Sequence, residues 1–182
     1  MGRPSDRDEK DRFSKVPSQA LQELMDSYGT IILRTAYFYV KDVHLAEDIS
    51  QEVFLRAYKN WSKFRGDSSV KTWLVKITVN VSRDKLRPKR AKEEPIDPKT
   101  IRKSFDYNLE DDVIKRMNNT EILKHVLALP PHYQEVLYLF YYVDLNIKEI
   151  AKMTKSPAGT VRGRLFRARK MLGEHLEKEG LA

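Results

Sequence analysis

Basic and aromatic side chains recur at helical spacing between residues 156 and 172, and this pattern has the chemistry needed to contact DNA. The segment reads S-P-A-G-T-V-R-G-R-L-F-R-A-R-K-M-L. Ser156 is a good N-cap and Pro157 suits the first helical position, so we expect the helix to begin with this pair. At about 100° per residue, one side of the helix is an apolar stripe that packs on the body of the protein. The stripe consists of Val161, Leu165, Ala168 and Leu172.

The opposite side of this helix has groups that suit a DNA groove. It carries Gly159, Arg162, Gly163, Phe166, Arg167 and Lys170. Arginine can bind guanine through two hydrogen bonds, and phenylalanine can contact a thymine methyl. Gly163 costs a helix interior about 1 kcal/mol relative to alanine, and close approach of another backbone is one reason to accept that cost. For this helix taken alone, a solvated arginine-rich face is the alternative.

The segment before this helix favours DNA binding over a merely solvated face. Asn146 followed by Glu149 is a capping-box pattern that begins an earlier helix. Residues 154–156 then provide the three-residue turn that a helix-turn-helix requires. Lys155 stands where that turn often has glycine. The sequence therefore predicts a helix-turn-helix.

Composition indicates a cytoplasmic protein with a polyanionic partner. The chain has 182 residues, 41% of them hydrophobic and 33% charged, and its net charge is +8. An excess of positive charge is typical of proteins that bind nucleic acid. The chain has no cysteine, which excludes disulfides and thiolate metal sites. We find neither a signal-peptide core nor an apolar run of membrane-spanning length, so we expect no membrane insertion.

Helical periodicity predicts the elements that position these residues, in two blocks. The first block has a helix capped by Ser18, a break at Lys41-Asp42, a helix at about 44–61, and a helix at about 70–87 capped from the loop 62–69. We expect the second helix to bury Ala46, Ile49, Val53 and Ala57, and the third to bury Trp73, Leu74, Ile77 and Val81. Trp61 and Phe64 are also expected in the core.

The second block resumes after a stretch rich in proline and mixed charge. No alternating strand pattern occurs, so we predict an all-α fold of two small helical domains joined by a flexible linker. The expected boundaries are a mobile tail at 1–16, a domain at 17–88, a linker at 89–117, a domain at 118–178 with the helix-turn-helix, and a tail at 179–182.

Three segments together resemble a known family. They read A-E-D-I-S-Q-E-V-F-L-R-A-Y at 46–58, F-R-G-D-S-S-V-K-T-W-L-V-K-I-T-V-N at 64–80, and L-P-P-H-Y-Q-E-V-L at 129–137 with V-R-G-R-L-F-R-A-R at 161–169. In order and spacing, the chain resembles the extracytoplasmic-function group of bacterial sigma factors, the two-domain promoter-recognition subunits of RNA polymerase. The resemblance implies core polymerase, through its β′ and β subunits, and promoter DNA as partners, and an anti-sigma factor as a further partner.

The resemblance implies that the second helix docks on a coiled coil of the β′ subunit. The residues in this role are Asp48, Gln51, Glu52 and Leu55. A mixed acidic and apolar patch suits burial against a basic helical pair. The alternative is that the acidic residues only favour the N-terminal half of a helix through its dipole.

The resemblance further implies that the loop at 64–69 and the helix after it melt and read the promoter −10 element. The implied residues are Arg65, Asp67, Ser68, Lys76, Asn80, Arg83, Lys85 and Arg87. Asn80 is at the position from which the family reads a flipped base, and an amide offers both a donor and an acceptor to a base edge. A capping or internally hydrogen-bonded asparagine is the alternative.

In the second domain, the helix-turn-helix is implied to read the −35 element in the major groove. The residues in this role are Thr160, Arg162, Gly163, Phe166, Arg167 and Lys170. Thr160 and Lys170 suit phosphates, whereas Arg162, Phe166 and Arg167 suit base edges.

Three other functions compete with a sigma factor. An enzyme is disfavoured because the four histidines are scattered, with no phosphate loop and no nucleophile elbow, so we expect neither a metal nor a cofactor. These histidines, expected at the surface or its boundary, are His44, His125, His132 and His175. A regulator that binds duplex DNA alone needs no melting loop. A sigma-like decoy that only binds an anti-sigma factor need not keep Asn80, Arg162 and Arg167.

Overall fold

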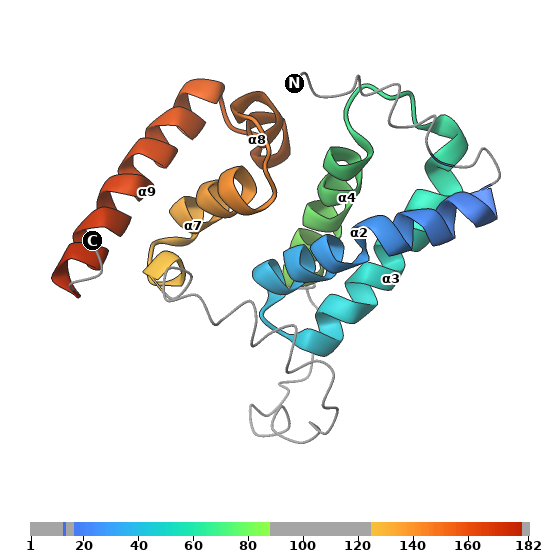
Figure 1. Ribbon diagram of the computed structural model, residues 1–182, viewed down its shortest axis with the longest axis horizontal. Coiled ribbons are helices and arrows are strands. Elements are labelled where there is room, and N and C mark those ends of the chain that lie inside the picture. The colour runs from blue at the N-terminus through green and yellow to red at the C-terminus, as the bar shows by residue number, and fades with distance from the viewer. Residues whose placement is uncertain (1–12, 14–16, 88–124, 180–182) are drawn as a thin grey trace. The chain divides into compact units, whose positions relative to one another are not determined.

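The protein is described here by a computed structural model that places residues 13, 17–87 and 125–179 (Figure 1). Every regular element in these ranges is a helix, so the predicted all-α fold is confirmed. The chain divides into two units, Met1–Asn108 and Leu109–Ala182. The predicted linker 89–117 and most of the predicted tails lie outside the described residues. No described helix is long and apolar enough to cross a membrane.

Unit 1 is built from three long helices that each pack against the other two. They are α2 (Pro17–Val40), α3 (Val43–Asn60) and α4 (Val70–Leu86), and a short 3-10 turn, η1 (Trp61–Lys63), follows α3. Their shared core includes Leu24, Ile32, Ile49, Val53, Leu74 and Val79, each at most 1% exposed. Within unit 1, this packing leaves the outer faces of α3 and α4 exposed.

The break between α2 and α3 lies where the sequence predicts it. Lys41 has a φ of 57°, which ends α2, and the Asp42 carboxylate accepts a hydrogen bond of 2.8 Å from the Leu45 N–H to cap α3. The predicted cap at Ser18 is wrong because α2 already begins at Pro17, whose missing N–H suits the first helical position.

The predicted inward face of α4 is partly wrong. Leu74 and Val81 are buried as expected, but Trp73 and Ile77 are only half-buried. Val75, Thr78, Val79 and Ser82 are buried instead. The buried residues of α4 therefore cover a wider arc of the helix than the single stripe that periodicity predicts.

The loop before α4 caps that helix as predicted. The Ser69 hydroxyl accepts a hydrogen bond of 3.0 Å from the Thr72 N–H. Gly66 has a φ of 75°, a conformation that glycine adopts without steric cost. The loop thus turns at Gly66 and ends in a fixed cap, which places its side chains next to the first turn of α4.

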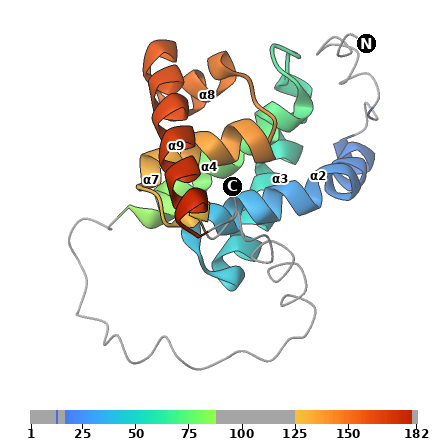
Figure 2. The same cartoon turned by 60° about the vertical axis from the view of Figure 1, so that its left-hand side comes forward.

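Unit 2 holds its last helix against two others. Its elements are α7 (Pro131–Leu137), the π-helical turn η3 (Tyr138–Tyr142), α8 (Ile147–Thr154) and α9 (Ala158–Lys178). Both α7 and α8 pack on α9. Figures 1 and 2 show α9 alongside α7, with α8 beside the N-terminal end of α9.

The helix-turn-helix is present, with its first helix capped as the sequence predicts. The Asn146 side chain accepts hydrogen bonds from the Lys148 and Glu149 N–H groups at 2.9 and 3.0 Å, and the Glu149 carboxylate accepts one from the Asn146 N–H at 2.8 Å. Lys155 takes the left-handed conformation, with φ 52° and ψ 38°, where glycine is common. Lys155 therefore ends α8 in a conformation that costs a lysine more free energy than it costs a glycine.

The start of α9 lies one residue later than predicted. Pro157, with ψ 145°, is the N-cap residue, and its carbonyl accepts the first helical hydrogen bond from the Val161 N–H at 3.1 Å. The Ser156 hydroxyl does not cap the helix, because it contacts the Thr154 carbonyl at 3.3 Å and the guanidinium of Arg164 at 3.3 Å. The turn therefore spans 155–157 instead of 154–156.

Candidate nucleic-acid interface

The two faces of α9 separate as its periodicity predicts. Val161, Leu165 and Ala168 are at most 2% exposed, whereas Leu172 is half-buried at the end of the stripe. On the other side Thr160, Arg162, Phe166, Arg167 and Lys170 are exposed. Phe166 is 70% exposed, more than any other large apolar side chain in the part of the chain that the structure describes. This face therefore combines positive charge with one exposed aromatic ring.

Gly163 leaves bare helix backbone in the middle of this face. A Cβ built on Gly163 would meet no protein atom within 4 Å, and the same holds for Gly159. Packing within the described chain therefore does not explain these glycines. Their lack of a side chain leaves room for another molecule to approach the α9 backbone.

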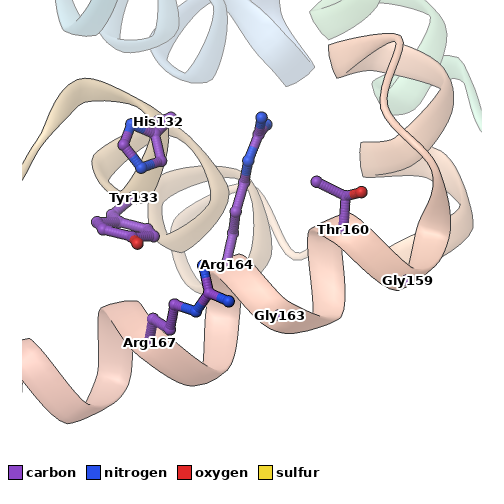
Figure 3. A pocket seen from close by; sticks show the side chains of 7 residues that line it. All are labelled: His132, Tyr133, Gly159, Thr160, Gly163, Arg164 and Arg167. Carbon is purple, nitrogen blue, oxygen red and sulfur yellow. The ribbon is translucent and has the colours of Figure 1, made fainter.

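An open cavity of about 650 Å³ lies beside these glycines (Figure 3). It is lined by His132, Tyr133, Gly159, Thr160, Gly163, Arg164 and Arg167. His132 and Tyr133 come from the first turn of α7, and the other residues come from α9. Two guanidinium groups, two hydroxyls and an imidazole line it, a set of groups that suits an anion such as a phosphate.

Sequence reasoning missed three residues of this cavity: His132, Tyr133 and Arg164. Arg164 lies between the buried stripe and the basic face, and its hydrogen bond to the Ser156 hydroxyl holds its stem half-buried. His132 and Tyr133 meet α9 only through the packing of α7 on α9. The positive charge of Arg164 could have indicated its place in this site. No feature of the sequence predicts that His132 and Tyr133 of α7 lie beside α9.

The other exposed arginine of α9 serves a different surface. Arg169 donates a hydrogen bond of 2.7 Å from its Nε to the Tyr141 hydroxyl. Its guanidinium also lies 5.4 Å from the Phe140 ring centroid and 5.5 Å from that of Tyr141. Arg169 is therefore held by the π-helical turn, whereas Arg162 and Arg167 are not.

The surface predicted on α3 is exposed, with one exception. Asp48, Gln51 and Leu55 are exposed, and Leu55 is 56% exposed. The buried side of α3 is the predicted one, with Phe54 added to it. An apolar side chain between acidic and amide groups on the outer face of a helix suits a protein contact.

Glu52 is the exception because it connects α3 with α4. Its carboxylate pairs with Arg56 on the next turn and lies 3.3 Å from the Lys85 Nζ on α4. Burial alone raises the pKa of Glu52, but the hydrogen bonds and positive charges of Arg56 and Lys85 outweigh burial and lower it. Residues predicted for two different surfaces, Glu52 and Lys85, are thus in direct ionic contact.

The loop and α4 present most of the remaining predicted residues to solvent. Arg65, Asp67, Lys76, Asn80, Lys85 and Arg87 are exposed, and Ser68 and Arg83 are half-buried. The Arg83 guanidinium lies 5.9 Å from the Tyr39 ring centroid, and the guanidinium of Arg87 is 3.6 Å from the Asp84 carboxylate. Exposed cations dominate this face, which therefore favours an anionic partner.

Asn80 is oriented toward solvent in the middle of that face. It is exposed, and its side-chain amide has no hydrogen bond to the part of the chain that the structure describes. An internally bonded amide would have its donor or acceptor occupied. Both groups of Asn80 are therefore available to a base edge.

The histidines do not gather into a site. Among residues 13, 17–87 and 125–179, no group of three or more histidine, aspartate or glutamate side chains could hold a metal ion. The expectation that each histidine lies at the surface or its boundary is wrong for His125. It is 8% exposed, and its Nε2 lies 3.5 Å from the Glu179 carboxylate.

Comparisons with known proteins match both units. Residues 24–92 match the family described as Sigma-70 region 2, and residues 120–172 match Sigma-70, region 4. The ECF RNA polymerase sigma factor SigW of Bacillus subtilis is 31% identical over 174 residues, which cover 91% of this chain and 93% of SigW. The ECF RNA polymerase sigma-E factor of Escherichia coli is 30% identical over 92% of each chain.

Two solved structures share the fold. One is CnrH in complex with the cytosolic domain of CnrY, with a TM-score of 0.62 and 20% identity over 96% of this chain and 99% of that one. The other is the sigma factor RpoE in complex with the anti-sigma factor NepR from Bartonella quintana, with a TM-score of 0.60 and 21% identity over 86% and 95% of the two chains.

Proposed function

Because this chain belongs to the extracytoplasmic-function group of sigma factors, it is a promoter-directing subunit of RNA polymerase, and we propose how its two units divide that work. Unit 1 docks on core polymerase and opens and reads the −10 element. Unit 2 reads the −35 element in duplex DNA. The separation of α9 into a buried apolar stripe and an exposed basic face with Phe166 is the observation that carries the assignment of unit 2.

In unit 2, α9 is the recognition helix. Arg162, Phe166 and Arg167 face the base edges, and the bare backbone at Gly163 lets the helix approach the groove closely. Thr160 and Lys170 contact phosphates. The cavity between α7 and α9 holds a backbone phosphate, which Arg164 and His132 bind from two helices.

In unit 1, the two outer faces do different work. The α3 face with Asp48, Gln51 and Leu55 docks on the β′ subunit, and its exposed mixture of acidic, amide and apolar groups supports this role. The loop at 64–69 and the exposed face of α4 hold the melted −10 strand. Asn80, whose amide is available, reads an extruded base.

In this proposal the chain itself catalyses no reaction. It acts in the cytoplasm, and it associates with the nucleoid through RNA polymerase. We further propose an anti-sigma factor as its regulator, since RpoE of similar fold was solved with the anti-sigma factor NepR. A decoy that only binds such a factor is disfavoured because Asn80, Arg162 and Arg167 are all present and exposed.

Reconstituted transcription tests this assignment. With core polymerase and a promoter library, we expect the protein to direct initiation at promoters that share −35 and −10 elements, and to bind promoter duplex weakly by itself. The reason is that two small domains are held at promoter spacing only on polymerase. Tight, specific binding by the isolated protein, unchanged by core enzyme, would indicate a conventional regulator. Core binding without initiation at any promoter would indicate a decoy.

Asn80→Ala is expected to reduce open-complex formation and to relax the base preference at one −10 position, with −35 recognition unchanged. Alanine leaves the edge of the extruded base unpaired, at a cost of about 1–3 kcal/mol. Permanganate footprinting on a series of −10 base substitutions measures both effects. Lys76→Ala, one turn earlier on the same helix, is the control. It is expected to reduce open-complex formation to the same extent on all −10 sequences. An unchanged preference profile in Asn80→Ala would make Asn80 a structural amide.

A further inference from the structure

Phe13 packs on the core of unit 1 although it precedes the first helix. Its ring centroid lies 6.0 Å from that of Trp61, with the rings at 87°, and 6.1 Å from that of Tyr28, with the rings at 43°. Phe13 is half-buried by these contacts. The near-perpendicular pair with Trp61 has the edge-to-face geometry that aromatic rings favour.

The contact with Trp61 is the outer end of a larger aromatic cluster, which comprises Phe13, Tyr28, Trp61, Phe64 and Trp73. Trp61 stacks on Phe64 with centroids 6.0 Å apart and rings at 21°. Phe64 stacks on Trp73 at 4.7 Å and 26°, and Trp61 lies 6.1 Å from Trp73. Trp61 and Phe64 are 3% and 7% exposed, so the middle of the cluster is closed to solvent.

The inner end of the aromatic cluster holds both ends of the loop at 64–69, which is called the −10 loop below. Phe64 directly precedes Arg65, and Trp73 lies in the first turns of α4 just after the Ser69 cap. Between them the loop turns at Gly66. The stacking of Phe64 on Trp73 therefore joins the two ends of the loop, and Trp61 contacts both rings of that stack as well as Phe13.

We propose that Phe13 is a positioning residue for promoter opening: it clamps Trp61 and thereby holds the −10 loop in the shape that receives single-stranded DNA. This rests on the proposed −10 role of the loop and Asn80. Loss of a ring pair of this kind is expected to change a conformational equilibrium constant by about twofold to tenfold. Without Phe13, part of the Trp61 ring is open to water and the loop samples other shapes, so promoter opening falls while polymerase docking, which uses α3, does not.

The chain offers a direct probe of this arrangement. Its two tryptophans, Trp61 and Trp73, both belong to the aromatic cluster, so the intrinsic tryptophan emission of the free protein reports on the cluster alone. Phe13→Ala is expected to shift this emission to longer wavelength and to increase its quenching by acrylamide. Phe13→Tyr keeps the ring and is expected to resemble wild type. Met25→Ala is the control for loss of an apolar side chain, since Met25 is 45% exposed on α2 and lies outside the cluster.

Promoter opening by saturating holoenzyme is the functional measurement. We expect Phe13→Ala to reduce permanganate reactivity at the −10 element by about twofold to tenfold, with unchanged affinity for core polymerase, and Phe13→Tyr to restore it. Unchanged emission in Phe13→Ala would show that the contact is absent, and changed emission with full promoter opening would show that it serves the fold only. Either result overturns the proposal.

Wild type and Asn80→Ala in the same assay separate this inference from the proposed function. If wild-type holoenzyme opens no promoter, the proposed function fails. If wild type opens promoters and Asn80→Ala impairs opening while Phe13→Ala does not, the inference about Phe13 fails and the proposed function stands.

Discussion

Asp48→Lys combined with Gln51→Lys is expected to lower the affinity for core RNA polymerase by at least about tenfold and to abolish promoter-specific transcription. Like charges brought together at an interface cost several kcal/mol. Both side chains are exposed and lie off the buried side of α3, so the fold is expected to remain intact. Competition with unlabelled wild type for core enzyme measures the loss, and circular dichroism with thermal unfolding checks the fold.

Unit 1 provides a matched control for this double substitution. Gln22→Lys with Asp26→Lys changes the same two residue types at exposed positions of α2 and adds the same charge. We expect it to bind core enzyme like wild type. If both double variants bind equally well, or equally poorly, the α3 face is not the docking surface.

Glu52 is a poorer position for this test than its neighbours. Glu52→Lys would place a third cation beside Arg56 and Lys85, so it would disturb the contact between α3 and α4 as well as the surface. Exposed ion pairs are each worth only about 0–1 kcal/mol, but a reversal changes attraction into repulsion. A loss of binding in Glu52→Lys would therefore not distinguish docking from stability.

Arg162→Ala is expected to cost about 1–3 kcal/mol of discrimination at one or two −35 base pairs, the range of a good bidentate contact with a base. Lys170→Ala is expected to weaken binding to all sequences alike and to reduce the salt slope by about one unit. Arg162 is in the first turns of α9, whereas Lys170 is two turns further along, where we expect the helix to leave the groove. Holoenzyme affinity for −35 variants across a salt series measures both effects.

Arg169→Ala is the matched control on the same helix. Its guanidinium is engaged by Tyr141, so we expect its loss to leave −35 discrimination unchanged. Equal, sequence-independent losses in Arg162→Ala and Lys170→Ala would contradict base reading by this helix. The basic face would then only position the DNA.

Local patterns in the sequence determined the elements and the faces of single helices. The capping box at Asn146 and the cap from the loop 62–69 could be predicted because each is a hydrogen bond within a few residues. The buried and exposed sides of α3 and α9 followed from periodicity, since each of these helices buries one narrow stripe. Motif resemblance added the family, which the comparisons confirmed.

Only the tertiary structure decided which side chains meet between elements. The pairs Glu52–Lys85 and Phe13–Trp61, and the cavity shared by His132 and Arg164, join residues far apart in sequence. The inward face of α4 could not be fully predicted either, because the packing buries Val75 in addition to Leu74 and so covers more than one stripe of the helix. Periodicity describes one helix about its own axis, whereas these contacts depend on how several helices pack, and that is set by the combined shape of their side chains.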